Sequence, residues 1–149
     1  MREILFKGKR TNNNEWIYGN LIHTKKEDLD YYEIITLDGL QSSTVKTETV
    51  RQFTGLTDKN GKKIFEGDII KAYFKPQNFK NPPYAIGSVI FENGTFKIVV
   101  HVSENSIEYK VFEKENTAAY SIEHNFLDRY YVLEVIGNIH DNMDEWFKF

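Results

Sequence analysis

Residues 54–70 read TGLTDKNGKKIFEGDII, which places dense turn chemistry directly before apolar residues suited to a buried strand. Residues 58–61, DKNG, tolerate positive φ angles, so they predict a tight hairpin. Residues 66–68, EGD, predict a second break in the chain before a strand that begins at Ile69. We interpret the whole stretch as a structural junction, because its glycines and acidic residues are explained by backbone geometry.

The length and composition of the chain restrict the classes of protein to which it can belong. A length of 149 residues suits one ordinary domain or two very small ones. The chain has no cysteine, which excludes disulfides, thiol nucleophiles and cysteine zinc sites. Aromatic residues make up 15%, a content that favours β-sheet packing. The net charge of −3 provides no global positive field for a polyanion, so nucleic-acid binding would require a local basic patch.

The chain shows no signal for export or membrane insertion. The amino terminus, MREILFKGKR, becomes charged again within a few residues and lacks a long apolar core. No window approaches the roughly 20 apolar residues of a membrane span. We expect a protein of the cytoplasm, without a membrane partner.

Alternation of apolar and polar residues predicts a mainly β fold. The polar turn at residues 11–14 predicts an amino-terminal hairpin that runs out to Leu21 or Ile22, and the charged segment Lys25–Asp30 predicts a loop. Asn93-Gly94 is the clearest hairpin signal. Further strands are expected at Tyr31–Leu37, Ile69–Phe74, Tyr84–Glu92, Thr95–Val102, Ile107–Val111 and Tyr131–Ile139.

Three segments deserve separate expectations. Tyr131–Ile139 is almost continuously apolar, so it is expected to be a central strand covered on both faces. The segment around Thr47 could hold a short helical turn capped by that residue, and a helical turn is an open alternative at Ala118–Ile122. Residues 143–149 predict a short carboxy-terminal helix, because Asn142 and Glu145 have the spacing of a capping box.

That predicted helix carries three large aromatic residues in its last four positions. Their side chains could dock onto their own domain, or they could form oligomer contacts with a neighbouring subunit. Both alternatives stay open from the sequence. The residues concerned are Trp146, Phe147 and Phe149.

Three sequence blocks in order, MREILFKGKR…EWIYGNLI, ETVRQFTGLTDKNGKKIFEGDII and EVIGNIHDN, resemble the YopX family of phage and prophage proteins. The resemblance covers residues 1–142. It implies a phage or prophage origin, a β-rich amino-terminal region at residues 1–56, and an SH3-like β-barrel at residues 57–149. It also implies self-association. The family has no established activity, so the resemblance transfers no catalytic residues.

The search for catalytic and ligand-binding motifs gives no candidate. The four histidines are far apart in the sequence, and no P-loop, GxGxxG, GxSxG or HExxH motif occurs. We therefore predict no enzyme, no catalytic residue, no cofactor and no metal. The carboxylates of Asp58, Glu66 and Asp68 could offer oxygens to a hard cation, but lysines interleave with them and we favour a turn-forming role.

Our leading functional prediction is a non-enzymatic, homo-oligomeric interaction module that works in the bacterial host cell, with any phage or host protein partner unidentified. The alternative is weak nucleic-acid binding through two clusters of basic residues, each carrying about three charges and therefore sensitive to salt. Solvated strand ends explain these clusters equally well. The candidate nucleic-acid contacts are Lys7, Lys9 and Arg10 in one cluster, and Lys59, Lys62 and Lys63 in the other.

Overall fold

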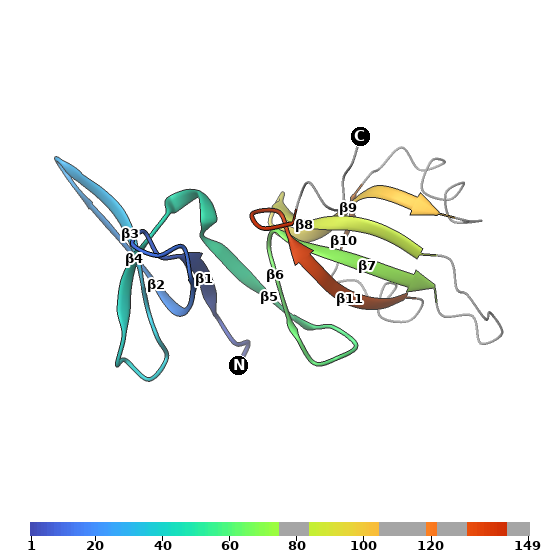
Figure 1. The fold of residues 1–149 in the computed structure, drawn as a ribbon, viewed down its shortest axis with the longest axis horizontal. Coiled ribbons are helices and arrows are strands. Elements are labelled where there is room, and N and C mark those ends of the chain that lie inside the picture. Colours follow the sequence, from blue (N-terminus) through green and yellow to red (C-terminus); the bar gives the residue numbers. More distant parts are fainter. Residues whose placement is uncertain (75–83, 105–118, 122–130, 143–149) are drawn as a thin grey trace. The chain divides into compact units, whose positions relative to one another are not determined.

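A computed structural model describes residues 1–74, 84–104, 119–121 and 131–142 of the chain (Figure 1). These residues form a mainly β protein with two antiparallel sheets. The chain divides into two compact units, unit 1 at Met1–Gly55 and unit 2 at Leu56–Phe149. The boundary thus falls within the junction stretch quoted above. Within the described ranges, no helix is long and apolar enough to cross a membrane.

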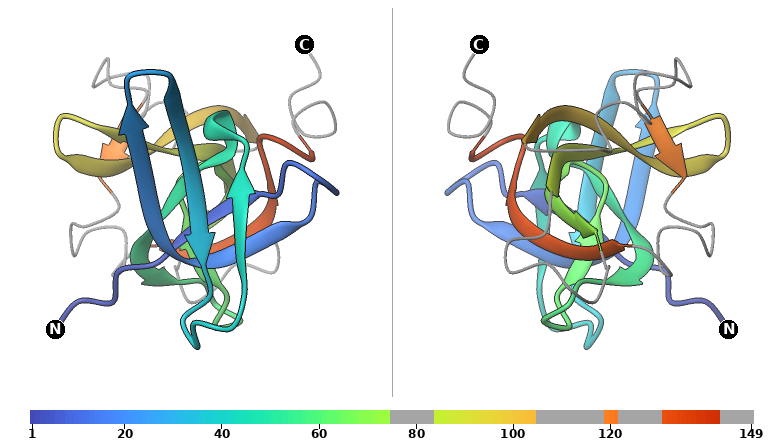
Figure 2. Two further views of the ribbon diagram at one scale, coloured as in Figure 1. Left: turned by 90° about the vertical axis from the view of Figure 1, so that its left-hand side faces the viewer. Right: turned by 90° about the vertical axis from the view of Figure 1, so that its right-hand side faces the viewer.

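The first sheet has the strand order β4-β3-β2-β1-β5-β6, and β5 crosses the division between the units. Its β2–β3 hairpin is the long blue ribbon of Figure 2. The elements up to the junction are β1 (Phe6–Lys9), β2 (Trp16–Lys26), β3 (Leu29–Ile35), β4 (Ser42–Val45), the 3-10 turn η1 (Thr47–Thr49) and β5 (Arg51–Thr57).

The core of unit 1 forms on one face of these strands. Ile17, Ile34 and Val45 are each no more than 3% exposed and pack together from three successive strands. Gly8 lies directly beneath Val45, and a Cβ on that glycine would come within 3.0 Å of the valine Cβ. The glycine therefore leaves the space that the branched side chain fills.

In unit 1, the edge strand β4 also contacts the end of β1. Arg10, just after β1, forms an isolated antiparallel bridge with Val45 of β4. The amide of Lys46 donates to the Lys9 carbonyl at 2.8 Å, next to this bridge. The Thr49 hydroxyl reinforces the joint, because it accepts from the Lys9 amide at 2.8 Å and donates to the Lys46 carbonyl at 2.7 Å.

Several predictions for unit 1 are confirmed and others need correction. The amino-terminal hairpin and the helical turn near Thr47 are confirmed, but the Thr47 cap is wrong: Lys46 is the N-cap, and it makes no side-chain capping bond. The loop at Lys25–Asp30 is wrong, because β2 continues to Lys26 and β3 starts at Leu29. The ladder extends through charged residues, where the register places Lys25 opposite Asp30 and the Asp30 Oδ1 lies 2.7 Å from His23 Nε2.

The second sheet has the order β10-β9-β8-β7-β11. Its main core contains Ile64, Ile70, Val89, Phe96 and Ile98, all no more than 4% exposed. The unit 2 strands are β6 (Lys63–Phe65), β7 (Asp68–Phe74), β8 (Tyr84–Glu92), β9 (Thr95–Glu104), β10 (Ala119–Ser121) and β11 (Tyr131–Asn138).

Two positions in unit 2 depend on their backbone conformation or on lacking a side chain. The β8–β9 hairpin is confirmed, and Asn93 and Gly94 have φ angles of 52° and 78°, which a primed hairpin turn requires. At Gly87, a Cβ would lie 2.4 Å from the Val99 carbonyl oxygen. A register shift between Ile86 and Gly87 accompanies this close approach, so the pairing of β8 with β9 is interrupted there.

The prediction of a central strand at Tyr131–Ile139 is wrong. Among the described residues, β11 is the last strand in the sheet order and pairs with β7 alone. Its apolar run nevertheless has a physical reason, because it serves two clusters. Leu133 and Val135 pack against the main core, whereas Ile136 and Ile139 pack against the pair Ile69 and Ile86.

Other predictions for unit 2 have mixed outcomes. The helical turn at Ala118–Ile122 is wrong at residues 119–121, which form β10 and pair with β9. The predicted strand at Ile107–Val111 and the predicted helix at residues 143–149 lie outside the described residues. The described strands form open sheets, so the mainly β class is confirmed without a closed barrel.

Candidate functional site

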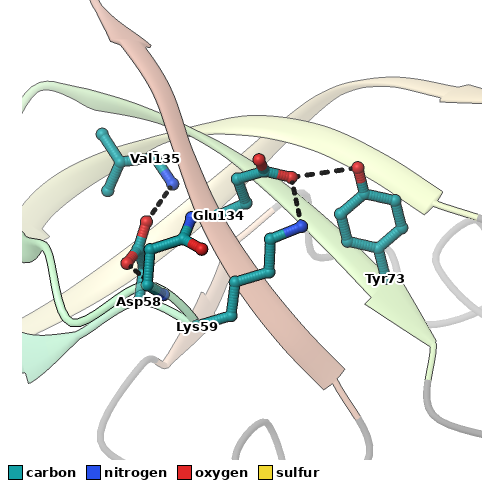
Figure 3. A network of polar contacts seen from close by, with 6 residues as sticks. Asp58, Lys59, Tyr73, Glu134 and Val135 are labelled. Carbon is teal, nitrogen blue, oxygen red and sulfur yellow. Dashed lines mark hydrogen bonds and ion pairs between the residues drawn. The ribbon is translucent and has the colours of Figure 1, made fainter.

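The turn between β5 and β6 holds a buried carboxylate, that of Asp58 (Figure 3). Its Oδ1 accepts from the backbone amides of Asn60 at 2.8 Å and Lys62 at 2.9 Å, which fixes the predicted hairpin turn. Its Oδ2 accepts from the amide of Val135 at 3.0 Å. One side chain therefore shapes its own turn and also binds the last strand of the sheet.

The backbone of this turn adds a second bond to β11. The Lys59 amide donates to the Leu133 carbonyl at 2.9 Å. Alternate residues of a strand direct their amide and carbonyl groups to the same side, so Leu133 and Val135 present the edge of β11 that faces away from β7. The turn thus satisfies an acceptor and a donor on an edge that would otherwise be free to pair with another strand.

The second turn of the junction stretch binds β8 and the residue that follows β11. Gly67, at φ 79°, donates its amide to the Val89 carbonyl at 2.7 Å and accepts from the Ile139 amide at 2.9 Å. The Asp68 carboxylate is only 2% exposed, and it accepts from the Phe65 amide at 2.8 Å. Both turns predicted from the sequence therefore organise unit 2.

The electrostatics of Asp58 favour its charged form. Burial is the largest single influence and would raise the pKa of this carboxyl group. The amides of Val135, Lys62 and Asn60 together outweigh burial, because each donates to the carboxylate, and the pKa lies below its ordinary value. The carboxylate is consequently ionised when it holds β11.

An ion pair lies beside this turn (Figure 3). Lys59 Nζ lies 2.8 Å from Glu134 Oε2, and the Tyr73 hydroxyl donates to the same oxygen at 3.0 Å. The bond from Lys59 lowers the pKa of Glu134, and the tyrosine bond assists. The bond to Glu134 in turn raises the pKa of Lys59. Both groups are charged at neutral pH, and they neutralise each other.

A second lysine lies on two aromatic rings next to this pair. Lys71 Nζ is 3.9 Å from the ring centroid of Tyr84 and 5.1 Å from that of Tyr73. The two rings face each other across β7 and β8, with centroids 6.2 Å apart and planes tilted by 57°. We call the set Lys59, Lys71, Tyr73, Tyr84 and Glu134 the aromatic–lysine cluster.

Unit 1 has a contrasting exposed surface. The cross-strand register places Trp16, Tyr18, Ile22 and Ile35 on the face of β2 and β3 opposite the unit 1 core. Tyr18 is 47% exposed and Ile22 is 40% exposed, although both belong to regular strands. We call these four residues the outer apolar face of unit 1.

Two lysines of the first predicted basic cluster contact an aromatic ring within unit 1. Lys7 is only 6% exposed, and its ammonium group lies 4.9 Å from the Trp16 ring centroid. Lys9 approaches the same ring at 5.4 Å. Arg10 instead donates from Nη2 to Gln41 Oε1 at 3.0 Å. The structure therefore brings two of the three cations together on an indole ring.

The three lysines of the second predicted basic cluster have different surroundings in the structure. Lys59 joins the aromatic–lysine cluster, Lys62 contributes its backbone amide to Asp58 and is otherwise exposed, and Lys63 is half-buried in β6. The role of either cluster in nucleic-acid binding stays a prediction. The predicted oligomer contacts at residues 146–149 lie outside the described part of the chain.

The sequence reasoning missed Lys71, Tyr73 and Tyr84 as members of one site. The period-2 pattern places Lys71 and Tyr73 on one face of their strand, which was an available signal. The cross-strand partner Tyr84 and the position of Glu134 opposite Lys71 depend on the strand register. That register could not be read from one segment alone.

The acidic residues of the junction act on the backbone. Asp58 and Asp68 both accept from amides of their own turns, as described above. Within the described ranges, no group of three or more histidine, aspartate or glutamate side chains is placed to hold a metal ion. The turn-forming interpretation accounts for the observed contacts of both carboxylates.

Comparison with known proteins identifies the family. No curated protein matches the chain at a significant level. A matching solved structure is that of protein EF1440 from Enterococcus faecalis, which is 20% identical, with a TM-score of 0.46 and coverage of 99% of this chain and 100% of that one. The family model described as YopX protein matches residues 5–144, nearly the whole sequence. The chain therefore belongs to the YopX family.

Proposed function

We propose that this protein is a non-enzymatic interaction module of phage or prophage origin that binds a second copy of itself in the bacterial cytoplasm. The outer apolar face of unit 1 is the observation that carries the proposal. Tyr18 and Ile22 are exposed there by 47% and 40%, on the side of the sheet opposite a well-packed core. Apolar side chains grouped on a solvent-facing sheet surface are typical of interaction sites.

The register extends this face across two strands, with the charged residues Lys7 and Glu33 at its sides as the cross-strand partners of Tyr18 and Ile22. Asn20 lies between Tyr18 and Ile22 along β2, and its cross-strand partner is Ile35. Ile35 therefore fills the position between the two exposed side chains, on the neighbouring strand. A second copy offers a surface of the same shape and chemistry, so a two-fold symmetric contact would cover both faces at once.

We also propose that residues 57–149 complete a small SH3-like barrel. The family resemblance suggests this architecture, and the antiparallel order of β7 to β11 with the tight β8–β9 turn is compatible with it. The aromatic residues Trp146, Phe147 and Phe149 supply a second candidate contact between copies. Their contribution is tested separately by the truncation described below.

Light scattering coupled to size-exclusion chromatography tests self-association. The wild-type chain at tens of micromolar should show a mass above that of the monomer. The double variant Tyr18→Ser with Ile22→Thr should shift the mass towards the monomer, because it removes exposed apolar surface without altering the core. Leu40→Ser is the matched control, since Leu40 is 81% exposed but lies in the turn before β4.

Removal of residues 144–149 separates the tail from the outer apolar face. If only the truncation lowers the mass, the contact lies in the tail and the assignment to unit 1 is wrong. A monomeric wild-type chain at these concentrations contradicts the whole proposal. Circular dichroism of each variant checks that the β structure is retained.

A further inference from the structure

We propose that the aromatic–lysine cluster of unit 2 binds single-stranded nucleic acid, with one base stacked on the Tyr73–Tyr84 platform and a phosphate on Lys71. This inference goes beyond the proposed self-association, because it concerns another unit, another surface and another class of ligand. The two proposals therefore stand or fall by different measurements.

The platform is held in place by the sheet beneath it. Tyr73 and Tyr84 are direct cross-strand partners, so their rings project from the same face of β7 and β8. Ile69 and Ile86 lie on that face and are 0% and 7% exposed, and Tyr84 packs against them. A platform with little remaining freedom loses little entropy when a flat ligand stacks on it.

The charge on this platform comes from Lys71. Lys59 and Glu134 neutralise each other at 2.8 Å, which leaves Lys71 as the cation not matched by a carboxylate within the cluster. Among the described residues, Lys71 forms no ion pair and its ammonium group lies over the two rings. An aromatic face attracts a cation weakly when it is exposed to water, so a phosphate can draw the ammonium group away.

On binding, a nucleic-acid base would replace the Lys71 ammonium group as the partner of a tyrosine ring. When Lys71 moves to a phosphate, it uncovers the Tyr84 ring, whereas Lys59 Nζ stays 5.0 Å from the Tyr73 ring centroid. A base of the same strand can then stack on that surface, as in other single-strand binding sites. Glu134, the cross-strand partner of Lys71, attracts this lysine electrostatically, but its Oε2 accepts from Lys59 and Tyr73.

The same features disfavour two other ligands. Duplex DNA keeps its bases stacked inside the helix and offers no free ring face to the tyrosines. An acidic peptide would satisfy Lys71 but leave the platform unused. One unmatched cation neutralises about one phosphate, so we expect weak binding that falls only gradually with salt.

Fluorescence anisotropy with a labelled oligothymidine of about ten nucleotides tests the site directly. The comparison ligand is an abasic strand of the same length, which has the phosphates but no bases. At low salt the oligothymidine should bind more tightly than the abasic strand by roughly 5-fold or more, since stacking of a base adds to the phosphate contact.

Matched variants then locate the contacts. Lys71→Gln and Tyr84→Leu should each weaken oligothymidine binding by roughly 5-fold or more, and Tyr84→Leu should also reduce the preference over the abasic strand. Lys97→Gln removes an equal charge from an ion pair with Glu92 in the β8–β9 hairpin and should leave binding unchanged.

Three outcomes overturn the proposal. They are the absence of oligothymidine binding at low salt, equal affinity for the abasic strand, and an effect of Lys71→Gln no larger than that of Lys97→Gln. Thermal unfolding of each variant separates loss of the site from loss of the fold. None of these outcomes depends on whether the protein self-associates through unit 1.

Discussion

The two units end their sheets by different chemical means. In unit 1, the last strand returns to the first through backbone groups, with the Lys46 amide bonded to the Lys9 carbonyl beside the bridge between Arg10 and Val45. In unit 2, the edge of β11 is occupied by a turn, and the bond to Val135 comes from the carboxylate of Asp58. Both arrangements satisfy edge groups that could otherwise recruit another strand.

This difference determines which kind of change should destabilise each unit. Backbone amides and carbonyls do not titrate between pH 3 and 10 in the way side chains do, so the closure of unit 1 depends on geometry. The closure of unit 2 combines a backbone bond, from the Lys59 amide to the Leu133 carbonyl, with a bond to one ionised side chain. Unit 1 should therefore be broken by a steric obstacle in its ladder, and unit 2 by a change at a single carboxylate.

The largest expected effect is from Gly19→Ala in unit 1. A Cβ at this position would lie 1.9 Å from the Ile35 carbonyl oxygen, so β2 and β3 must separate to accept it. We expect a loss of about 3 kcal/mol in the free energy of unfolding, measured by urea denaturation. Gly39→Asn is the control, because its added side chain meets open space and asparagine tolerates the φ of 73°. Equal stability of Gly19→Ala and wild type would show that the strands are not this close.

Asp58→Ala should have the next largest effect, and it should act on unit 2. The variant leaves the amides of Asn60, Lys62 and Val135 without their acceptor. Bonds to a buried charged group are strong but not additive, so we expect a loss of about 2 to 3 kcal/mol in denaturation experiments. Lys59→Gln is the matched control, because it removes only the neighbouring half-exposed ion pair and should lower the free energy of unfolding much less than Asp58→Ala does. A similar small effect for Asp58→Ala would refute the role of the carboxylate.

Thr49→Val tests the contrast between the two units, because the Lys9 amide of unit 1 is also bonded to a side chain, the Thr49 hydroxyl. The hydroxyl group is replaced by a methyl group of similar size, which deprives the buried Lys9 amide of its acceptor. We expect a loss of about 1.5 kcal/mol in the free energy of unfolding, smaller than for Asp58→Ala, because the backbone bonds of the joint remain. A loss larger than that of Asp58→Ala would reverse the contrast between the units.

The smallest expected effect is the pH dependence, to which Asp58 and Glu134 contribute in unit 2 and the exposed Asp38 contributes in unit 1. The pKa values of Asp58 and Glu134 are lowered by folding, so their contribution is fully present above the unfolded carboxyl values of about 4 and is lost as the pH falls through the folded values. Stability measured by denaturation should thus decline below about pH 4. The decline should be shallower for Asp58→Asn, whereas Thr49→Val should keep the wild-type slope. Identical slopes for wild type and Asp58→Asn would contradict this assignment.

Local turn chemistry explains the features that the sequence predicted well. Asn93-Gly94 and the DKNG turn carry residues whose own backbone preferences determine a hairpin, so no distant contact is needed to identify them. Strand β4 was not predicted because Ser42–Val45 has little apolar alternation, and its pairing with β3 supplies the order that its composition does not.

Non-local contacts explain what the sequence could not show. The apolar run of β11 indicated a strand covered on both faces, but two separate clusters use those faces at the edge of the sheet. The bond between Asp58 and Val135 joins positions 77 residues apart, and no local pattern marks such a pair. The aromatic–lysine cluster likewise depends on the registers between β7 and both of its neighbours.

Amide hydrogen exchange at Val135 tests most directly whether the Asp58 carboxylate closes the edge of unit 2. At pH 7, the wild-type Val135 amide should be protected, and Asp58→Ala should abolish that protection beyond the change in global stability. The Glu134 amide is the internal reference, because antiparallel alternation directs it towards β7. Continued protection of Val135 in Asp58→Ala, equal to that of Glu134, would show that another group closes this edge and would contradict the account.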